Sequence, residues 1–147
     1  NLVEKRGIFR PQTSYSDKVF LLKLYPGTDP SILDYLQEKG CRGVYVEGFG
    51  LGGMPFLKND FIGAVKKAVE NGMVILAGSQ CRYEGSNLSV YETGRRALES
   101  GVLQAYDMTA EAAMAKLMWV LGQTDSLREI REYFSVDIAG EVTIPKE

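Results

Sequence analysis

A glycine-rich turn is the first segment whose residue types and spacing could do chemistry. The stretch VEGFGLGGMPF places Gly48, Gly50 and Gly53 in a GxGxxG pattern, directly after the apolar run GVYV. In a dinucleotide-binding domain, such glycines let the backbone approach a pyrophosphate at the N-terminus of the following helix. The same glycines would also suit a tight turn between a strand and a helix, because glycine adopts positive φ without strain.

Two features that a dinucleotide site requires are missing from the sequence. Pro55 disfavours helical backbone at Met54, so we expect the next helix to begin too late to face a phosphate. An acidic residue should also end the next strand, where it would hold a ribose hydroxyl, but that strand ends in AGSQ (77–80). The pattern therefore favours another use of the turn.

A polar loop, SQCRYEGSNLS (79–89), follows the next expected strand along the chain. Open parallel sheets bind ligands beyond the carboxyl ends of their strands, where the glycine turn and this loop should meet. We therefore predict a ligand-binding or interdomain edge, in which Arg82 could bind a carboxylate through two hydrogen bonds. Its predicted residues are Gly50, Gly52, Gly53, Gln80, Cys81, Arg82 and Tyr91.

Other site chemistries are disfavoured by composition. The chain contains no histidine, which argues against a zinc site and a histidine-based triad. Cys41 and Cys81 form no metal-type pair, and we expect both to be free, buried thiols. Thr93 and Thr109 fit turn or helix-start roles, and neither has an apparent general base. We expect no catalytic residue, no metal and no cofactor in this chain.

The bulk composition indicates one globular domain. The chain has 147 residues, of which 45% are hydrophobic, enough for a proper core. Seventeen basic and nineteen acidic residues give a net charge of -2, and no block of Lys or Arg points to nucleic acid or an anionic membrane. No apolar run is long enough to span a bilayer. Because the chain begins with Asn1 and lacks an initiator Met, we interpret it as part of a longer protein.

Apolar strands alternate with amphipathic helices along the chain. We interpret residues 1–17 as an interdomain linker and residues 18–147 as the domain. The expected strands are 19–25, 43–48, 73–78 and 102–106, and the expected helices are about 30–39, 61–70, 90–100, 109–122 and 126–135. Strands without polar alternation indicate a parallel sheet covered on both faces. We therefore predict an α/β fold, a small open parallel sheet of about four strands with helices on both faces, in a Rossmann-like or flavodoxin-like three-layer sandwich.

The expected helix 109–122 is apolar on nearly every side. In TAEAAMAKLMWVLG, only Glu111 and Lys116 are charged. Such a helix is buried on more than one side. With one face on the sheet, the other should form an apolar patch through which the chain self-associates as a two-fold dimer. Alternatively, the helix 126–135 folds back and covers that face.

Several motifs occur in the order found in a known family. They are YPGTDPSIL (25–33), GVYVEGFGLGGMPF (43–56), GSQCRYEG (78–85), YETGRRAL (91–98), GVLQAYDMTAEAAMAKLMWVL (101–121) and AGEVT (139–143). Together they resemble the C-terminal domain of L-asparaginases, especially the type I (cytosolic) branch. The D-type component of archaeal glutamyl-tRNA(Gln) amidotransferases shares this architecture and is the alternative.

The resemblance implies a two-domain amidohydrolase that converts asparagine to aspartate and ammonia in the cytoplasm. It implies catalytic threonines, an aspartate and a lysine in an N-terminal domain that this chain lacks, so the chain alone should be inactive. It also implies a homodimer or homotetramer in which this domain forms one edge of the partner's active site. A stand-alone amino-acid-binding module and a dimerisation scaffold remain as alternatives.

In some type I members this domain also helps to hold an effector asparagine, and Cys81 matches a cysteine associated with that site. The sequence departs from this pattern at two positions. Gly53 stands where type I members often carry Asn, and Glu47 stands where some carry a basic residue. A buried, purely structural Cys81 is the competing interpretation.

Overall fold

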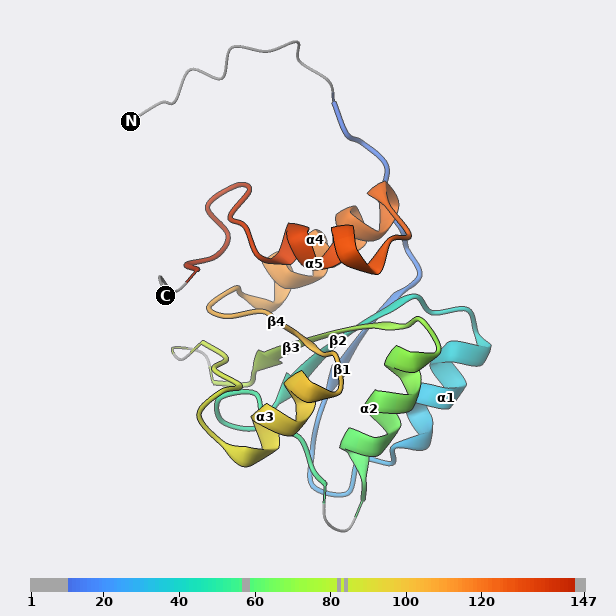
Figure 1. Cartoon of the computed structure of the whole chain (residues 1–147), viewed down its shortest axis with the longest axis vertical. Helices are drawn as coiled ribbons and strands as arrows, with labels where there is room; N and C mark the ends of the chain where they lie inside the picture. Colours follow the sequence, from blue (N-terminus) through green and yellow to red (C-terminus); the bar gives the residue numbers. More distant parts are fainter. Residues whose placement is uncertain (1–10, 57–58, 82, 84, 145–147) are drawn as a thin grey trace.

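The computed structural model describes residues 11–56, 59–81, 83 and 85–144. Its centre is a parallel sheet of four strands in the order β1-β2-β3-β4 (Figure 1). The strands are β1 (Val19–Lys23), β2 (Gly43–Gly48), β3 (Val74–Ser79) and β4 (Leu103–Gln104). The helices are α1 (Ser31–Glu38), α2 (Phe61–Glu70), α3 (Glu92–Glu99), α4 (Ala110–Gln123) and α5 (Leu127–Phe134).

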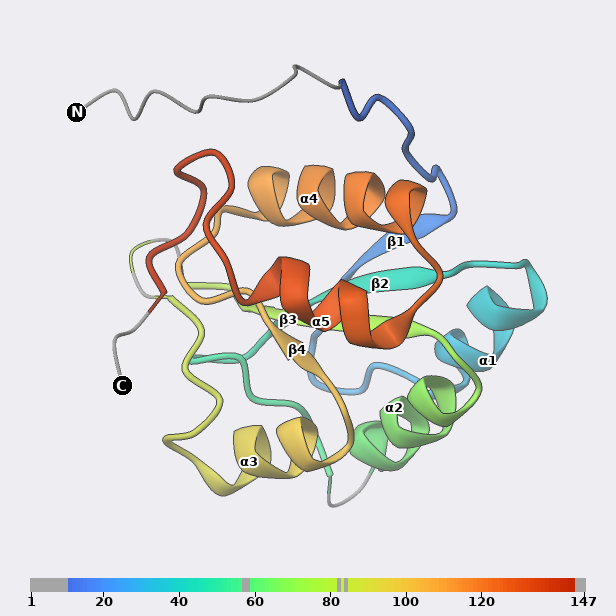
Figure 2. The same ribbon diagram turned by 45° about the horizontal axis from the view of Figure 1, so that its top comes forward.

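The strand order explains how the layers form. Each strand pairs with the next one along the chain, so three right-handed crossovers in one direction place α1, α2 and α3 on the same face. The chain then returns over the other face as α4 and α5, as Figure 2 shows. The predicted three-layer α/β sandwich is confirmed. Because the strand order never reverses, the sheet has no switch point of the kind that binds dinucleotides.

Side chains of the central strand alternate between two cores. Val44 and Val46 of β2 pack into the core under α1, α2 and α3, whereas Tyr45 packs into the core under α4 and α5. All three are at most 1% exposed. This double burial is why β2 and its neighbour β3 lack polar alternation in the sequence.

Side-chain caps fix where three of the helices begin. Asp60 accepts a hydrogen bond from Gly63 N and starts α2, while Thr109 and Ser126 act in the same way for α4 and α5. The expected bounds of these helices are confirmed to within a residue. The last strand is shorter than expected, with two residues in place of 102–106, because the chain turns away at Tyr106, whose φ is +53°.

The outer face of α4 differs from expectation. Trp119 packs edge-on against Tyr133 of α5, with ring centroids 5.2 Å apart, and its indole Nε1 donates a hydrogen bond to the Gln12 carbonyl 2.9 Å away. Residues 12–16 lie across the C-terminal half of this helix, and Met114, Met118 and Trp119 are only half-exposed. The prediction of an exposed apolar patch on α4 is therefore wrong. Within the described ranges, no helix is long and apolar enough to cross a membrane.

Candidate functional site at the carboxyl edge of the sheet

The glycine turn after β2 folds back on itself. Phe49 and Gly53 form an isolated antiparallel bridge, and the Phe49 carbonyl accepts hydrogen bonds from both Gly52 N and Gly53 N, at 3.0 and 2.8 Å. Gly50 and Gly52 have φ of +50° and +100°, which glycine adopts without strain. Since two of its N–H groups are used within the turn and α2 begins only at Phe61, the segment does not form a pyrophosphate cradle.

An apolar pocket of about 800 Å³ opens beside this turn. Of the predicted site residues, Gly50, Gly53 and Tyr91 line it. The other lining residues are Gly27, Phe49, Leu51, Met54, Pro55, Phe56, Asn59 and Thr93. A Cβ on Gly53 would lie 3.0 Å from the Thr93 hydroxyl oxygen, so the glycine leaves this wall of the pocket open. Gly52 is buried and packs towards Leu88 instead.

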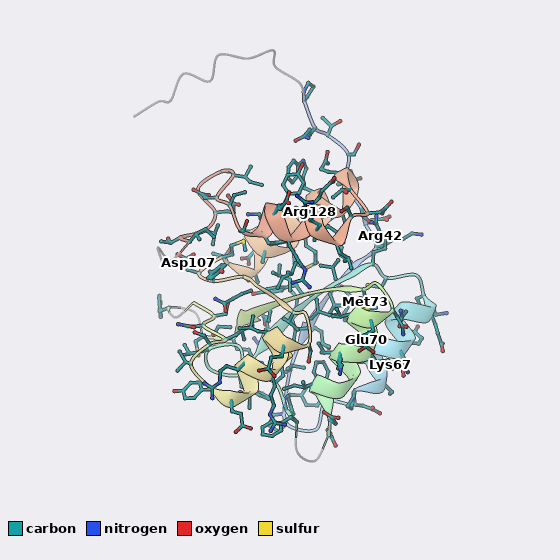
Figure 3. The ribbon with its side chains drawn as sticks, viewed as in Figure 1. Arg42, Lys67, Glu70, Met73, Asp107 and Arg128 are labelled. Carbon is teal, nitrogen blue, oxygen red and sulfur yellow. The ribbon has the colours of Figure 1, made fainter. Side chains whose placement is uncertain are left out.

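A second, polar pocket of about 500 Å³ lies at the same carboxyl edge, where β3 and β4 end. Gln80 and Cys81 line it, together with the carboxylates of Glu47, Asp107 and Glu111. Figure 3 shows Asp107 at this end of the molecule and Arg42 at the opposite end. The structure thus brings the two predicted loops to one edge but divides the predicted residues between two pockets.

The two loops are joined by hydrogen bonds. The Ser79 hydroxyl, at the end of β3, donates to the Gly50 carbonyl and accepts from Cys81 N. The Gln80 amide nitrogen donates to the Leu24 carbonyl at 2.6 Å and to the Glu47 carbonyl at 2.9 Å. Gln80 therefore ties together the ends of β1 and β2, a structural role that sequence reasoning did not identify.

Carboxylates dominate the electrostatics of the polar pocket. Lys23 pairs with Glu47 at 3.1 Å. Burial raises the pKa of Tyr45, beneath the pocket, to about 12, and the nearby charges of Glu47 and Glu111 add to the rise. The Thr143 backbone N–H donates to Asp107 and lowers the pKa of that carboxyl. An ionised Asp107 and a neutral Tyr45 are thus expected at pH 7.

The two cysteines differ in their surroundings, and both are free. Cys81 is exposed at the polar pocket, so its interpretation as a buried structural thiol is wrong. Cys41 is half-buried, and burial raises its thiol pKa against the opposing effect of the Gly43 carbonyl contact. Arg82 lies outside the described residues.

The described residues contain no activated nucleophile. Thr109 Oγ1 accepts from Ala112 N as the cap of α4, and Thr93 lies in the first turn of α3 with its hydroxyl towards Gly53. Within the described ranges, neither hydroxyl hydrogen-bonds to a carboxylate or a lysine, and no group of three metal-binding side chains occurs.

These features define an α/β domain with two pockets at the carboxyl edge of its sheet. The model of the glutaminase/asparaginase C-terminal domain family matches residues 18–134. The chain belongs to this family, and the resemblance inferred from its motifs is confirmed.

Similar proteins include amidotransferase components and asparaginases. The chain is 46% identical over 129 residues to the D-type component of the glutamyl-tRNA(Gln) amidotransferase of Thermococcus kodakarensis, covering 88% of this chain and 29% of that protein. The thermostable L-asparaginase of the same organism superposes with a TM-score of 0.84 at 38% identity, covering 88% and 39% of the two chains. For L-asparaginase I of Vibrio cholerae the TM-score is 0.83 at 28% identity, covering 94% and 41%. The chain thus spans under a third of the length of the T. kodakarensis amidotransferase component.

Proposed function

We propose that this chain is the C-terminal domain of an L-asparaginase, an amidohydrolase that converts asparagine to aspartate and ammonia. One observation carries the proposal: two pockets, built by the loops after β2 and β3, open at one sheet edge where, among the described residues, neither Thr93 nor Thr109 hydrogen-bonds to a general base. Such an edge needs a catalytic domain to face. The N-terminal asparaginase domain is the partner that would supply it, and this chain alone is inactive.

The apolar pocket is the proposed contact for the catalytic domain or its substrate. Its walls are Phe49, Met54 and Phe56, and Tyr91 at its rim is 61% exposed. Gly53 widens the pocket towards Thr93.

We further propose a homodimer or homotetramer in the cytoplasm. Two free cysteines are typical of a reducing compartment, and one structure of similar fold is titled a probable cytoplasmic L-asparaginase from Campylobacter jejuni. Because α4 offers no open apolar face, association should instead use the exposed aromatic rings after β1 and β3. Tyr25 and Tyr91 are 62% and 61% exposed. Sedimentation at micromolar concentration tests this, and a clean monomer at all concentrations would refute it for this chain.

A second candidate is the D-type component of a glutamyl-tRNA(Gln) amidotransferase. The observation that favours it is the higher identity to that protein than to the asparaginase of the same organism, 46% against 38%, with equal coverage of this chain. The same pocketed edge would then serve a site whose ammonia goes to a tRNA-bound substrate.

A domain exchange tests both candidates. Residues 11–144 replace the matching C-terminal segment in the T. kodakarensis asparaginase and, separately, in the D-type component of its amidotransferase, and asparagine-dependent ammonia release is measured. We expect activity in the asparaginase graft, with Lys66→Ala, on the exposed outside of α2, as a neutral control. A graft that unfolds cooperatively but releases no ammonia would refute the first candidate. Activity confined to the amidotransferase graft with its tRNA substrate would favour the second.

A further inference from the structure

Residues 12–16, here called the strap, are held on α4 by their backbone. Trp119 Nε1 donates to the Gln12 carbonyl at 2.9 Å, and Gln123 Nε2 donates to the Ser14 carbonyl at 2.6 Å. Ser16 N donates to the Met118 carbonyl at 2.9 Å. The strap thus makes three hydrogen bonds to the last turns of one helix. Its side chains before Ser16 remain exposed, while Ser16 itself is buried.

The helix is shaped to receive the strap at Gly122. A Cβ at this position would lie 2.5 Å from Tyr15 N and overlap the backbone on either side of that atom. The neighbouring atoms are main chain and cannot rotate away as a flexible side chain would. Gly122 lies inside α4, where alanine is favoured over glycine by about 1 kcal/mol. Close approach of the strap is the physical reason for glycine at this position.

We propose that the strap is a positioning device that fixes where the preceding polypeptide joins the domain. If it were free, the seven residues from Gln12 to Lys18 could place that junction anywhere within about 24 Å of β1. Docked, it holds residue 12 over Trp119, on the α4 and α5 side of the sheet. A domain attached before the strap is thereby confined to a smaller volume relative to the sheet, which raises its effective concentration there. This last step rests on the proposed function, whereas the docking does not.

Proteolysis of the 147-residue chain tests the docking. Chymotrypsin can cleave after Tyr15 only when the strap leaves α4, because Ser16 N is hydrogen-bonded and Ser16 is buried. Cleavage after Tyr83, 93% exposed, is the internal reference, and mass spectrometry follows both products. Gly122→Ala should accelerate cleavage after Tyr15 at least tenfold relative to that reference, and should change the emission of Trp119, the single tryptophan.

Gln123→Ala is the second variant, and Gln37→Ala is its matched control. Gln37 also donates from its side-chain amide to a backbone carbonyl, that of Asn71, but between α1 and α2. Gln123→Ala should accelerate the Tyr15 cleavage several-fold and Gln37→Ala should leave it unchanged. Wild-type cleavage after Tyr15 as fast as after Tyr83, or no acceleration in Gly122→Ala, overturns the docking.

The asparaginase graft tests the positioning role. Gly122→Ala in that graft should lower kcat/KM for asparagine several-fold and should leave the ligand affinity of the apolar pocket unchanged. Gln37→Ala should leave kcat/KM unchanged. An unchanged kcat/KM with faster Tyr15 cleavage would overturn positioning while leaving docking intact. If the unmodified graft is inactive, the proposed function fails, and the proteolysis result still decides whether the strap is docked.

Discussion

Glu141→Gln should destabilise the fold through a lysine buried within the α4 and α5 layer. Lys116, with a side chain 4% exposed, donates to Glu141 and to the Val136 carbonyl 2.7 Å away. Glu141 also accepts hydrogen bonds from the backbone N–H groups of Ile138 and Ala139. A glutamine presents one acceptor oxygen where the carboxylate presents two, so its amide hydrogens would face other donors.

The size of the effect follows from the carboxyl pKa. Burial raises it, but Lys116 and the N–H groups of Ala139 and Ile138 outweigh burial and lower it from 4.5 to about 2. At about 1.4 kcal/mol per unit, the full shift corresponds to about 3 kcal/mol of folding free energy. Because the carboxylate is 13% exposed and water screens it in part, we expect a loss of about 2 kcal/mol. For a domain of this size, that lowers Tm by about 4–8 °C.

The pH dependence of the effect has a definite sign. A carboxyl whose pKa is depressed on folding contributes its full stability above the unfolded value, and loses it as pH falls through the folded value. The difference between wild type and Glu141→Gln should thus be constant above pH 5 and should shrink between about pH 4.5 and 2. Urea unfolding at several pH values measures it.

Two further variants make the reasoning refutable. Glu132→Gln removes an exposed carboxylate paired with Arg128 at 3.0 Å and should change stability by less than about 0.5 kcal/mol. Adding Lys116→Met to Glu141→Gln removes the unpaired buried charge and should recover most of the loss. A Glu141→Gln protein as stable as wild type at pH 7, or a deficit that persists unchanged at pH 2.5, would refute the role assigned to this pair.

Three other outcomes are expected. A thiol reagent should modify Cys81 much faster than Cys41, since Cys81 is exposed and burial raises the pKa of the other thiol, and peptide mass spectrometry would reveal the opposite order. Gln80→Ala should cost about 1–2 kcal/mol in urea unfolding because the Leu24 carbonyl loses its donor, while the Glu47 carbonyl keeps the Leu24 N–H, and a neutral result would mean that water replaces the amide. Gly122→Ala should lower Tm although glycine-to-alanine changes inside helices ordinarily raise it, so an increase would show that the strap does not press on the helix.

The fold was predictable because its signals are local. Apolar runs marked the strands, and amphipathic stretches between them marked the helices. The last strand was misjudged because VLQAY has strand-like composition throughout, whereas its end is set by Tyr106 turning into left-handed backbone. A tyrosine carries no sequence signal for that conformation, and the turn is fixed by contacts such as Ser86 N to the Tyr106 carbonyl.

The site was predictable only to the level of the sheet edge. Parallel strands guarantee that the loops after β2 and β3 lie at the same edge, but no pattern predicts that the Gln80 amide reaches back to Leu24 and Glu47. The strap was missed for a related reason: its segment QTSYS is polar, and it docks through backbone groups that every residue of the segment carries. Gly122 was the available clue, but at the end of an expected helix it suggested a terminus rather than a close approach.

The structure also separates the parts that position the edge from the parts that hold the outer layer. The carboxyl edge rests on β2 and β3, which pair along six residues each, from Gly43 with Val74 to Gly48 with Ser79. The strap and the Lys116–Glu141 pair contact α4 and the segment after α5 instead. A perturbation of that layer should therefore change how the preceding polypeptide is held and how stable the chain is, without reshaping the apolar pocket, which takes no lining residue from that layer. The polar pocket is coupled to the layer, because Glu111 lies in α4 and the Thr143 N–H donates to Asp107. Positioning by the strap can therefore be separated from the apolar pocket but not from the polar one.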